Sequence, residues 1–275
     1  MKKCLSLAII AILCIGCFAG CGKKEYDFTN TDGLKGATIV AEKGSAGESV
    51  ATKNALFSKA KYTAVDTQAK ALMEVSSGTA DAAIVDYVMS IGSIGEGTDY
   101  KDLAVVNGVE FNPEEYGIAF RKGSDATNFI NQALMQLKED GTLQEIASKY
   151  KLQDLIQVKD SFDEPQITED SDWEYIKNKG KLIIGITYFA PMNYMDDNNN
   201  LIGFDTELAQ AVCAKLGVEP VFQEIIWEAK ETELAAKNID CIWNGMTIDD
   251  EKKENMSLTI PYMENKQVLV KNTSK

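Results

Sequence analysis

The chain has 275 residues and a formal net charge of −14. Such an acidic balance argues against nucleic acid or anionic lipid as a binding partner. The sequence contains no histidine, which excludes histidine general bases, histidine metal ligands and nucleophile pairs of the Ser-His or Cys-His kind. If the first residues are removed as a leader peptide, the remaining chain is long enough for one large domain or for two lobes of ordinary size.

The first residues have the pattern of an export signal. Lys2 and Lys3 precede an apolar run, residues 4–18, which ends in small residues. A basic start, a short apolar segment and small residues before a cleavage point are typical of a secretory signal peptide. The run is shorter than the ~20 residues of a membrane span. We therefore expect a signal peptide over residues 1–20 and a tether over residues 21–33.

The end of this leader resembles a bacterial lipobox. Phe18-Ala-Gly precedes Cys21, which predicts cleavage before Cys21 and its lipidation. More than one acyl chain on such a residue suits stable anchoring, so the protein is expected at the cell membrane, lipid-anchored on the extracytoplasmic face. Plain secretion, or cleavage at the small residues before Cys17, is the alternative.

Four of the six cysteines lie within residues 1–21, which leaves Cys213 and Cys241. Two cysteines do not make a disulfide framework. They are either two buried small apolar residues or the partners of a single bridge.

After the tether, short apolar runs typical of strands alternate with runs of helical periodicity. In the first half we expect a turn at 44–47, strands at 38–41, 81–86 and 116–121, and helices at 48–58, 67–77, 126–139 and 143–150. Asp140-Gly141 separates the last two helices, because glycine readily ends a helix. This alternation predicts an α/β fold whose sheets are covered by helices.

The second half begins after an acidic stretch, residues 159–172, which contains Pro165 and lacks apolar periodicity. This composition is typical of a linker. Ser171, with Glu174 three residues later, has the pattern of a helix-capping box. We then expect a turn at 196–200, strands at 181–187, 221–226, 239–243 and 266–271, and a helix at 203–216 that ends at Gly217.

Two segments resemble the openings of the two lobes of a known family, but in reversed order. Residues 182–191, LIIGITYFAP, resemble the strand that opens its first lobe, and residues 34–47, LKGATIVAEKGSAG, resemble the opening of its second. The family is the extracellular solute-binding proteins of polar amino-acid ABC importers. The resemblance covers nearly all of the chain after the leader. It implies a two-lobed periplasmic-binding-protein-like fold of type II, here circularly permuted.

The permuted order predicts how the chain is divided. Lobe two would be residues 34–115 together with the strand 266–271, and lobe one would be residues 117–262. The acidic linker 159–172 would mark the permutation joint. One half taken from each of two fused or swapped copies is the alternative.

A free amino acid offers an ammonium, a carboxylate and a side chain, and each has candidate partners here. Asp86 ends a buried apolar run, and the carboxyl ends of strands in α/β sheets face the ligand cleft. The resemblance makes Asp86 the ammonium ligand, and a strand-end turn residue is the alternative. Ser45 and Ala46 lie in a turn between strand and helix, where backbone N–H groups bind anions.

The resemblance places a second carboxylate ligand in the segment 244–252, NGMTIDDEK. Lys252 stands where the family has arginine, which grips a carboxylate through two hydrogen bonds, whereas lysine acts as a point charge. This substitution predicts looser geometry and weaker binding, or a ligand without an ordinary α-carboxylate. A solvent-facing Lys252 is the alternative.

Further ligand-binding residues follow from the resemblance. Asn244, Gly245 and Thr247 belong to the same segment, and Gly245 and Thr247 would offer a carbonyl and a hydroxyl to the ammonium. Phe189 and Trp227 match the aromatic residues that enclose the ligand's side chain, and Thr187 replaces an acidic residue common in this loop. Separately, Glu42 lies near the cleft edge and could meet a polar or cationic ligand tip, whereas Trp243 lies within a strand and is expected in the core.

These residues favour a monomeric, membrane-anchored receptor, not an enzyme, that captures a small polar amino acid and passes it to an ABC permease. No cofactor or metal site is expected, and no nucleic acid. Two other functions stay open: a ligand-sensing module for a separate signalling protein, and a dehydratase on the same fold. The dehydratase would need a general acid in the cleft, and only Glu42 is available for that role.

Overall fold

The computed structural model describes residues 25–162 and 172–274. Its strands are β1 (Thr38–Glu42), β2 (Lys61–Val65), β3 (Ala82–Asp86), β4 (Leu103–Val105), β5 (Pro113–Arg121), β6 (Lys181–Ile186), β7 (Tyr194–Met195), β8 (Leu201–Ile202), β9 (Glu219–Glu224), β10 (Cys241–Thr247), β11 (Met256–Leu258) and β12 (Met263–Asn272). Its α-helices are α1 (Ala46–Lys53), α2 (Gln68–Ser77), α3 (Tyr87–Ser93), α4 (Ala126–Glu139), α5 (Thr142–Lys149), α6 (Asp172–Lys179), α7 (Phe204–Leu216), α8 (Lys230–Ala235) and α9 (Asp250–Asn255).

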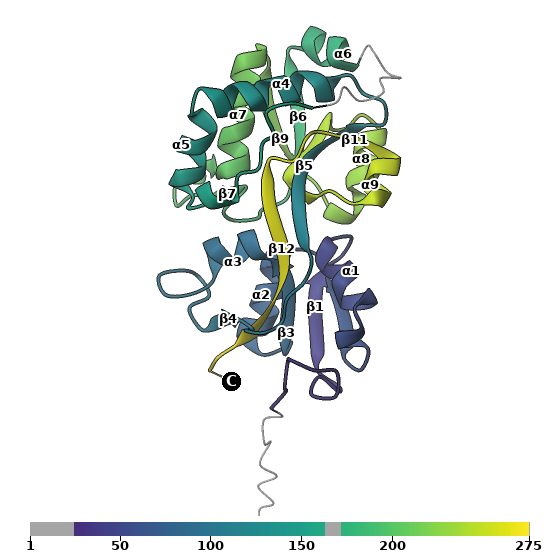
Figure 1. Ribbon diagram of the computed structural model, residues 1–275, viewed down its shortest axis with the longest axis vertical. Coiled ribbons are helices and arrows are strands. Elements are labelled where there is room, and N and C mark those ends of the chain that lie inside the picture. The colour runs from purple at the N-terminus through teal and green to yellow at the C-terminus, as the bar shows by residue number, and fades with distance from the viewer. Residues whose placement is uncertain (1–24, 163–171, 275) are drawn as a thin grey trace, which may run out of the picture.

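The fold is mixed α/β and has two lobes, as the sequence predicts (Figure 1). One lobe contains β1 to β4 and α1 to α3, and the other contains α4 to α9 with β6 to β11. Helices cover the sheet of each lobe, which suits strands that are apolar on both faces. All five residues of β3, for example, are buried.

Two long neighbouring strands, β5 and β12, connect the lobes (Figure 1). The main sheet has the order β2-β1-β3-β12-β5-β10-β6-β9. Residues 263–266 of β12 pair with β5, whereas residues 267–271 pair with β3. The remainder of β5 pairs with β10 and β11 in the other lobe. Strand β12 is therefore one of the two connecting strands and also a strand of the sheet in the lobe that contains β1 to β4.

Most of the expected helices are present within a residue or two of their predicted ends. Thr67 caps α2, because its hydroxyl accepts a hydrogen bond from the N–H of Lys70, and Gly217 ends α7 with φ 71°. The prediction of a single helix over residues 48–58 is wrong. Asn54 ends α1 in an extended conformation, and its side chain then caps a short 3₁₀ helix, Ala55–Phe57. The sequence pattern of apolar residues did not show this interruption.

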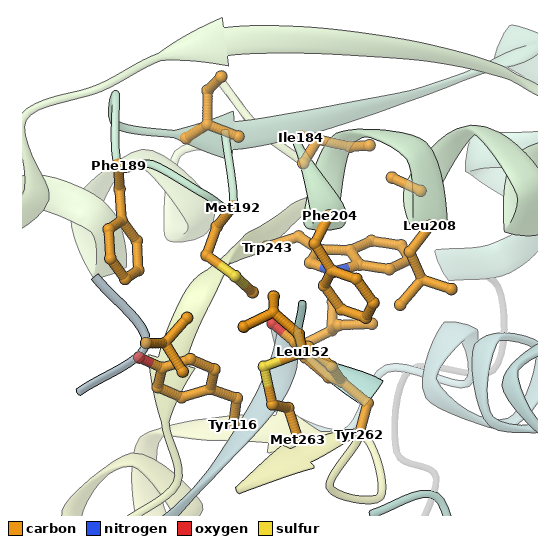
Figure 2. Close-up of a cluster of buried hydrophobic side chains, with 14 of the residues drawn as sticks. Tyr116, Leu152, Ile184, Phe189, Met192, Phe204, Leu208, Trp243, Tyr262 and Met263 are labelled. Carbon is orange, nitrogen blue, oxygen red and sulfur yellow. The ribbon is translucent and has the colours of Figure 1, made fainter. Parts of the chain in front are cut away.

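A cluster of large apolar side chains packs beside the connecting strands, in the lobe that contains α4 to α9 (Figure 2). Tyr116 of β5, Trp243 of β10 and Tyr262, which precedes β12, are fully buried there. Phe204 stacks on Tyr262, with ring centroids 6.2 Å apart. Trp243 is thus a core residue, as expected. This cluster supports the strand ends that carry the site.

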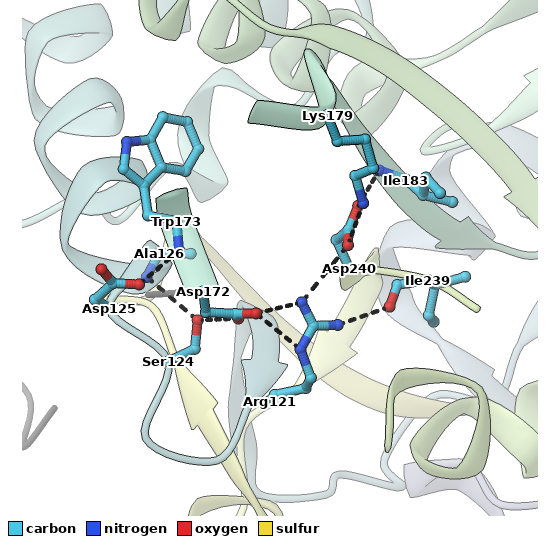
Figure 3. Close-up of polar contacts among 10 residues, drawn as sticks. All are labelled: Arg121, Ser124, Asp125, Ala126, Asp172, Trp173, Lys179, Ile183, Ile239 and Asp240. Carbon is cyan, nitrogen blue, oxygen red and sulfur yellow. Dashed lines mark hydrogen bonds and ion pairs between the residues drawn. The ribbon is translucent and has the colours of Figure 1, made fainter. Parts of the chain in front are cut away.

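A buried charged cluster ties three elements of the same lobe together (Figure 3). Arg121 at the end of β5 donates to Asp172 of α6 through two nitrogens, at 3.0 and 2.6 Å. Asp240 lies 3.5 Å from the same guanidinium and also accepts from Lys179, at 2.7 and 2.6 Å. Two cations and two carboxylates therefore neutralise one another.

The described part of the expected tether is not extended. Phe28 is buried against the first lobe, and Tyr26 donates to the carbonyl of Gly36. This aromatic pair gains more by packing on the apolar cluster that contains Leu34 and Ile39 than by remaining in water. Cys21, the leader 1–20 and the central part of the linker, residues 163–171, lie outside the described residues.

Both remaining cysteines, Cys213 and Cys241, are buried and free, so the structure has no bridge between them. Across residues 25–162 and 172–274, none of the helices combines the length and apolar character needed to cross a membrane.

Candidate functional site

One pocket between the lobes brings together all ten residues that the sequence predicts to bind a ligand. These residues are Ser45, Ala46, Asp86, Thr187, Phe189, Trp227, Asn244, Gly245, Thr247 and Lys252. Three further residues complete the lining, namely Glu42, Gly44 and Gln68. The residues come from distant parts of the chain because the ends of β1, β3, β6 and β10 meet there.

On one side, the pocket is bounded by the turn that leads from β1 into α1. Gly44 has φ +72°, a conformation that favours glycine. Ser45 caps the helix, since its hydroxyl accepts from the N–H of Glu48 at 3.2 Å and donates to the carbonyl of Glu42 at 2.7 Å. The first N–H groups of α1 therefore face the pocket from a helix N-terminus, where an anion is favoured.

Asp86 lies at the carboxyl end of β3 and is 5% exposed. Its Oδ2 accepts from the amide of Gln68, and its Oδ1 accepts from Asn265 at 2.5 Å and from Gln267 at 2.8 Å. Burial raises the pKa of Asp86, and the hydrogen bonds from these amides lower it. The carboxylate is thus held in a fixed orientation by three side-chain amides before it meets any ligand.

The opposite wall is organised by Asn244 of β10. Its Oδ1 accepts from the N–H and the hydroxyl of Thr187, at 3.0 and 2.7 Å. Its Nδ2 donates to the carbonyl of Thr187 at 2.9 Å and to Oδ1 of Asn193 at 2.7 Å. Asn244 lines the pocket, but its donors and acceptor already hold the end of β6 in place.

Gly245 is the next residue and has φ +56°. A Cβ atom there would lie 2.6 Å from the ring of Phe189, so only glycine lets the aromatic side chain approach this strand. The N–H of Gly245 donates to Asp205 at 2.8 Å. Asp205 is fully buried, and burial raises its pKa to about 7, while hydrogen bonds from Tyr262 and Gly245 lower it.

Lys252 of this lobe lines the pocket, and Lys230 lies beside the pocket residue Trp227. Lys252 pairs with Asp249, the cap residue of α9, and its side chain is 12% exposed. Lys252 therefore points toward the pocket and not into bulk solvent. Lys230 is 5% exposed and lies 4.8 Å from the ring centroid of Trp227.

Direct contacts join the lobes around the pocket. Lys230 donates to the carbonyl of Gly44 at 3.0 Å, and Lys43 forms an ion pair with Glu228 at 2.9 Å. A Cβ atom on Gly44 would lie 3.1 Å from the Cα atom of Glu228. The backbones of the two lobes thus approach each other closely at this turn.

The pocket is contracted in this structure. Its free volume is about 20 Å³, which is room for roughly one water molecule. Any larger ligand requires the lobes to separate or the lining side chains to move. An open groove of about 930 Å³ adjoins the pocket and shares Ala46 and Thr247 with it, but none of the described residues that line this groove is aromatic.

Sequence reasoning missed Gln68 and the amides behind Asp86. Gln68 follows the cap residue of α2, and Asn265 and Gln267 lie at alternate positions on β12. The alternation of polar residues at 265 and 267 is the one signal that could have indicated a shared face. Among the described residues, no group of three or more His, Cys, Asp or Glu side chains is placed to hold a metal ion.

The class that this arrangement defines is a two-lobed protein with a polar pocket between its lobes. The chain matches the family model of bacterial extracellular solute-binding proteins, family 3, over residues 182–275. The L-cystine-binding protein TcyJ of Escherichia coli is 34% identical over 88 residues, or 32% of this chain and 33% of that protein. The glutamine-binding protein GlnH of an ABC transporter in Bacillus subtilis is 30% identical over 151 residues, or 48% of this chain and 54% of that protein.

A solved structure gives a similar partial match. It is a polar amino acid ABC uptake transporter substrate binding protein from Streptococcus thermophilus, 41% identical over 34% of this chain and 35% of that chain, with a TM-score of 0.32. The chain spans about a third of the length of TcyJ and about half that of GlnH. It is related to the family 3 solute-binding proteins through a family match confined to its last third.

Proposed function

We propose that this protein binds a polar amino acid between its two lobes and delivers it to an ABC importer, without catalysing a reaction. The observation that carries the proposal is the convergence of Asp86 and the Ser45 turn, from one lobe, with Lys252 and the aromatic residues of the other. The names of the relatives support it, since they are binding proteins for cystine, arginine, histidine or glutamine.

The proposed roles follow the chemistry of the lining. Asp86 binds the ammonium, and the N–H groups at the start of α1 bind the carboxylate together with Lys252. Phe189 and Trp227 enclose the side chain. Because the carboxylate would be bound from both lobes and the side chain is enclosed by only one of them, ligand binding favours the closed arrangement of the lobes.

The test is a thermal-shift screen of the protein, starting after residue 21, against the common amino acids and cystine. We expect stabilisation by one or a few polar amino acids, because a ligand that binds only the folded state raises the melting temperature. Asp86→Asn should abolish the shift. No shift with any amino acid would contradict the proposed function.

We also propose that the chain is circularly permuted, with lobe two formed by residues 34–115 and 266–271 and lobe one by residues 117–262. Support comes from β12, whose last residues pair with β3. In addition, Lys271 lies 5.6 Å from the ring centroid of Phe28, so the two ends of the described chain are close. A variant that begins at residue 172, joins residue 274 to residue 25 through a short linker and ends at residue 162 should fold and keep its ligand affinity. Failure of that variant to fold would contradict the permutation.

The proposed location is the extracytoplasmic face of the membrane, through a lipid on Cys21, where the monomeric receptor would meet its permease. The support is the lipobox-like segment before Cys21 and the extracellular family of the relatives. Metabolic labelling with an alkyne fatty acid should mark the wild-type protein but not Cys21→Ser. Equal labelling of both would contradict the anchor.

A further inference from the structure

Glu42 is an unsatisfied acidic group in the pocket. It ends β1, it is 3% exposed, and it lines the space between the lobes. Its Oε1 is fully buried and has no hydrogen-bond partner among the described residues. A buried carboxyl oxygen without a partner costs free energy. Such a group persists at a binding site when a ligand supplies the missing donor.

The other polar groups of the pocket are already engaged. Both oxygens of Asp86 accept hydrogen bonds from side-chain amides, two at Oδ1 and one at Oδ2, which leaves one acceptor position at Oδ2 for the α-ammonium. Lys252 is paired with Asp249, and Thr247 donates to Glu114 at 3.0 Å. Glu42 is therefore the pocket carboxylate that has an oxygen free for a new partner.

The charges that face Glu42 come from three elements. Asp86 at the end of β3 repels its ionised form, whereas Lys230 of α8 stabilises it. Lys252 of α9 lines the same pocket. The ammonium of Lys230 is directed to two backbone carbonyls, those of Gly44 at 3.0 Å and Trp227 at 3.3 Å. Lys230 thus lies near Glu42 but donates its hydrogen bonds to these two carbonyls and not to the carboxylate.

We propose that Glu42 binds a positively charged group at the end of the ligand's side chain, so that the pocket selects cationic α-amino acids. This inference rests on the amino-acid-binding function proposed above. Asp86 would hold the α-ammonium, and Glu42 would hold the second cation. The ring of Trp227 already faces the ammonium of Lys230, which lies 4.8 Å from its centroid. The carboxylate of Glu42 is therefore the group that distinguishes a cationic side chain from a neutral one of the same shape.

Arginine and citrulline form the matched ligand pair for the test, because citrulline replaces the guanidinium by a neutral urea group of similar shape. Calorimetric titration of the wild-type protein should give tighter binding of arginine. In Glu42→Gln, which keeps the side-chain volume, arginine affinity should fall by about 10-fold or more, the size expected for a lost charge-assisted hydrogen bond. Citrulline affinity should change by less than about threefold.

Glu110→Gln is the control, since it removes the same charge from an exposed position outside the pocket. Thermal melting of both variants shows whether they are folded. Equal wild-type affinity for arginine and citrulline would overturn the inference. An equal loss of affinity for both ligands in Glu42→Gln would also overturn it, because that result would place Glu42 at the α-amino group. If the protein binds no amino acid at all, the proposed function itself fails, which is a different result.

The pH dependence gives a second readout. Burial and Asp86 raise the pKa of Glu42 to about 8, against the opposing effect of Lys230. A bound cation favours the ionised carboxylate, so binding near neutral pH should release a proton. Arginine affinity should therefore rise with pH up to about 8, and this rise should be absent in Glu42→Gln. An identical pH profile in both proteins would contradict the role of Glu42.

Discussion

Two buried groups of charged side chains in the described part of the chain differ in how well their members are paired. In the cluster around Arg121, two cations and two carboxylates contact one another, and Asp240 and Asp172 accept additional hydrogen bonds from a backbone N–H and from Ser124. In the pocket, Glu42 keeps an oxygen without a partner among the described residues, and Lys252 is the lysine that lines the same space from the opposite lobe.

Under the proposed function, this difference in pairing distinguishes charged side chains that stabilise the fold from charged side chains that bind the ligand. A paired cluster within one lobe fixes the positions of β5, β10 and α6 and needs nothing from outside. The pocket spans two lobes, and under the proposed function a ligand between them would supply the partner that Glu42 lacks.

Arg121→Met should destabilise the protein by about 3–5 kcal/mol, because Asp172 and Asp240 would remain buried without their shared partner. Urea denaturation measures this loss. Lys59→Met, which removes an exposed partner of Asp32, should cost less than about 1 kcal/mol. If Arg121→Met instead left stability unchanged but lowered ligand affinity, the cluster would not be a structural one.

Asp205, behind the pocket, should make stability depend on pH. Its pKa is 3.8 in an ordinary setting and about 7 in the folded protein, so the folded state binds its proton more tightly. The stabilisation is complete below pH 3.8 and is lost as the pH rises to about 7. Asp205→Asn should remove about 2–4 kcal/mol of this pH-dependent change. Denaturation at several pH values tests this, and parallel profiles for the two proteins would refute it.

Lys252→Met should weaken binding of a carboxylate-bearing ligand by about 10- to 100-fold, through the loss of a charged hydrogen-bond donor. The same amino acid with its carboxylate converted to an amide should bind both proteins equally. Lys253→Met is the control, because Lys253 is exposed and pairs with Asp250. Equal losses for acid and amide would show that Lys252 does not contact the carboxylate.

Gly44→Ala should lower ligand affinity by about fivefold, since the lobes would keep their contact at this turn while the pocket side chains move aside for the ligand, and the added Cβ would press against Glu228 of the opposite lobe. Gly108→Ala is the matched control, with φ +79° and open space around the added atom. Both variants should lose roughly 1–2 kcal/mol of stability from the left-handed backbone, but only Gly44→Ala should bind more weakly. Identical affinities would mean that the lobes close without this contact.

Much of the fold could be predicted from the sequence, because apolar periodicity and capping residues mark most elements locally. Helix α4, with fourteen residues and a clear apolar face, is an example. The strand β2 was not predicted, since its residues are mostly exposed and lack an apolar run. Helix α3 directly follows β3 at Asp86, with no loop between them that would separate two elements in a sequence pattern.

The site residues could be named because strand ends and one glycine-rich turn pointed to them, together with the family resemblance. What could not be predicted is how they are engaged. Asn244 was expected to contact a ligand, yet its side chain holds Thr187 and Asn193. The amides of Asn265 and Gln267 reach Asp86 from nearly 180 residues away in the chain, and no local pattern records such a distant pairing.

The measurement that tests the central claim most directly is a crystal structure of the protein with the amino acid that the thermal-shift screen selects. We predict one ligand between the lobes, with its ammonium at Asp86 and its carboxylate at Ala46 and Lys252, in a pocket wider than the present one. A ligand bound in the neighbouring groove, or held by one lobe alone, would contradict the account.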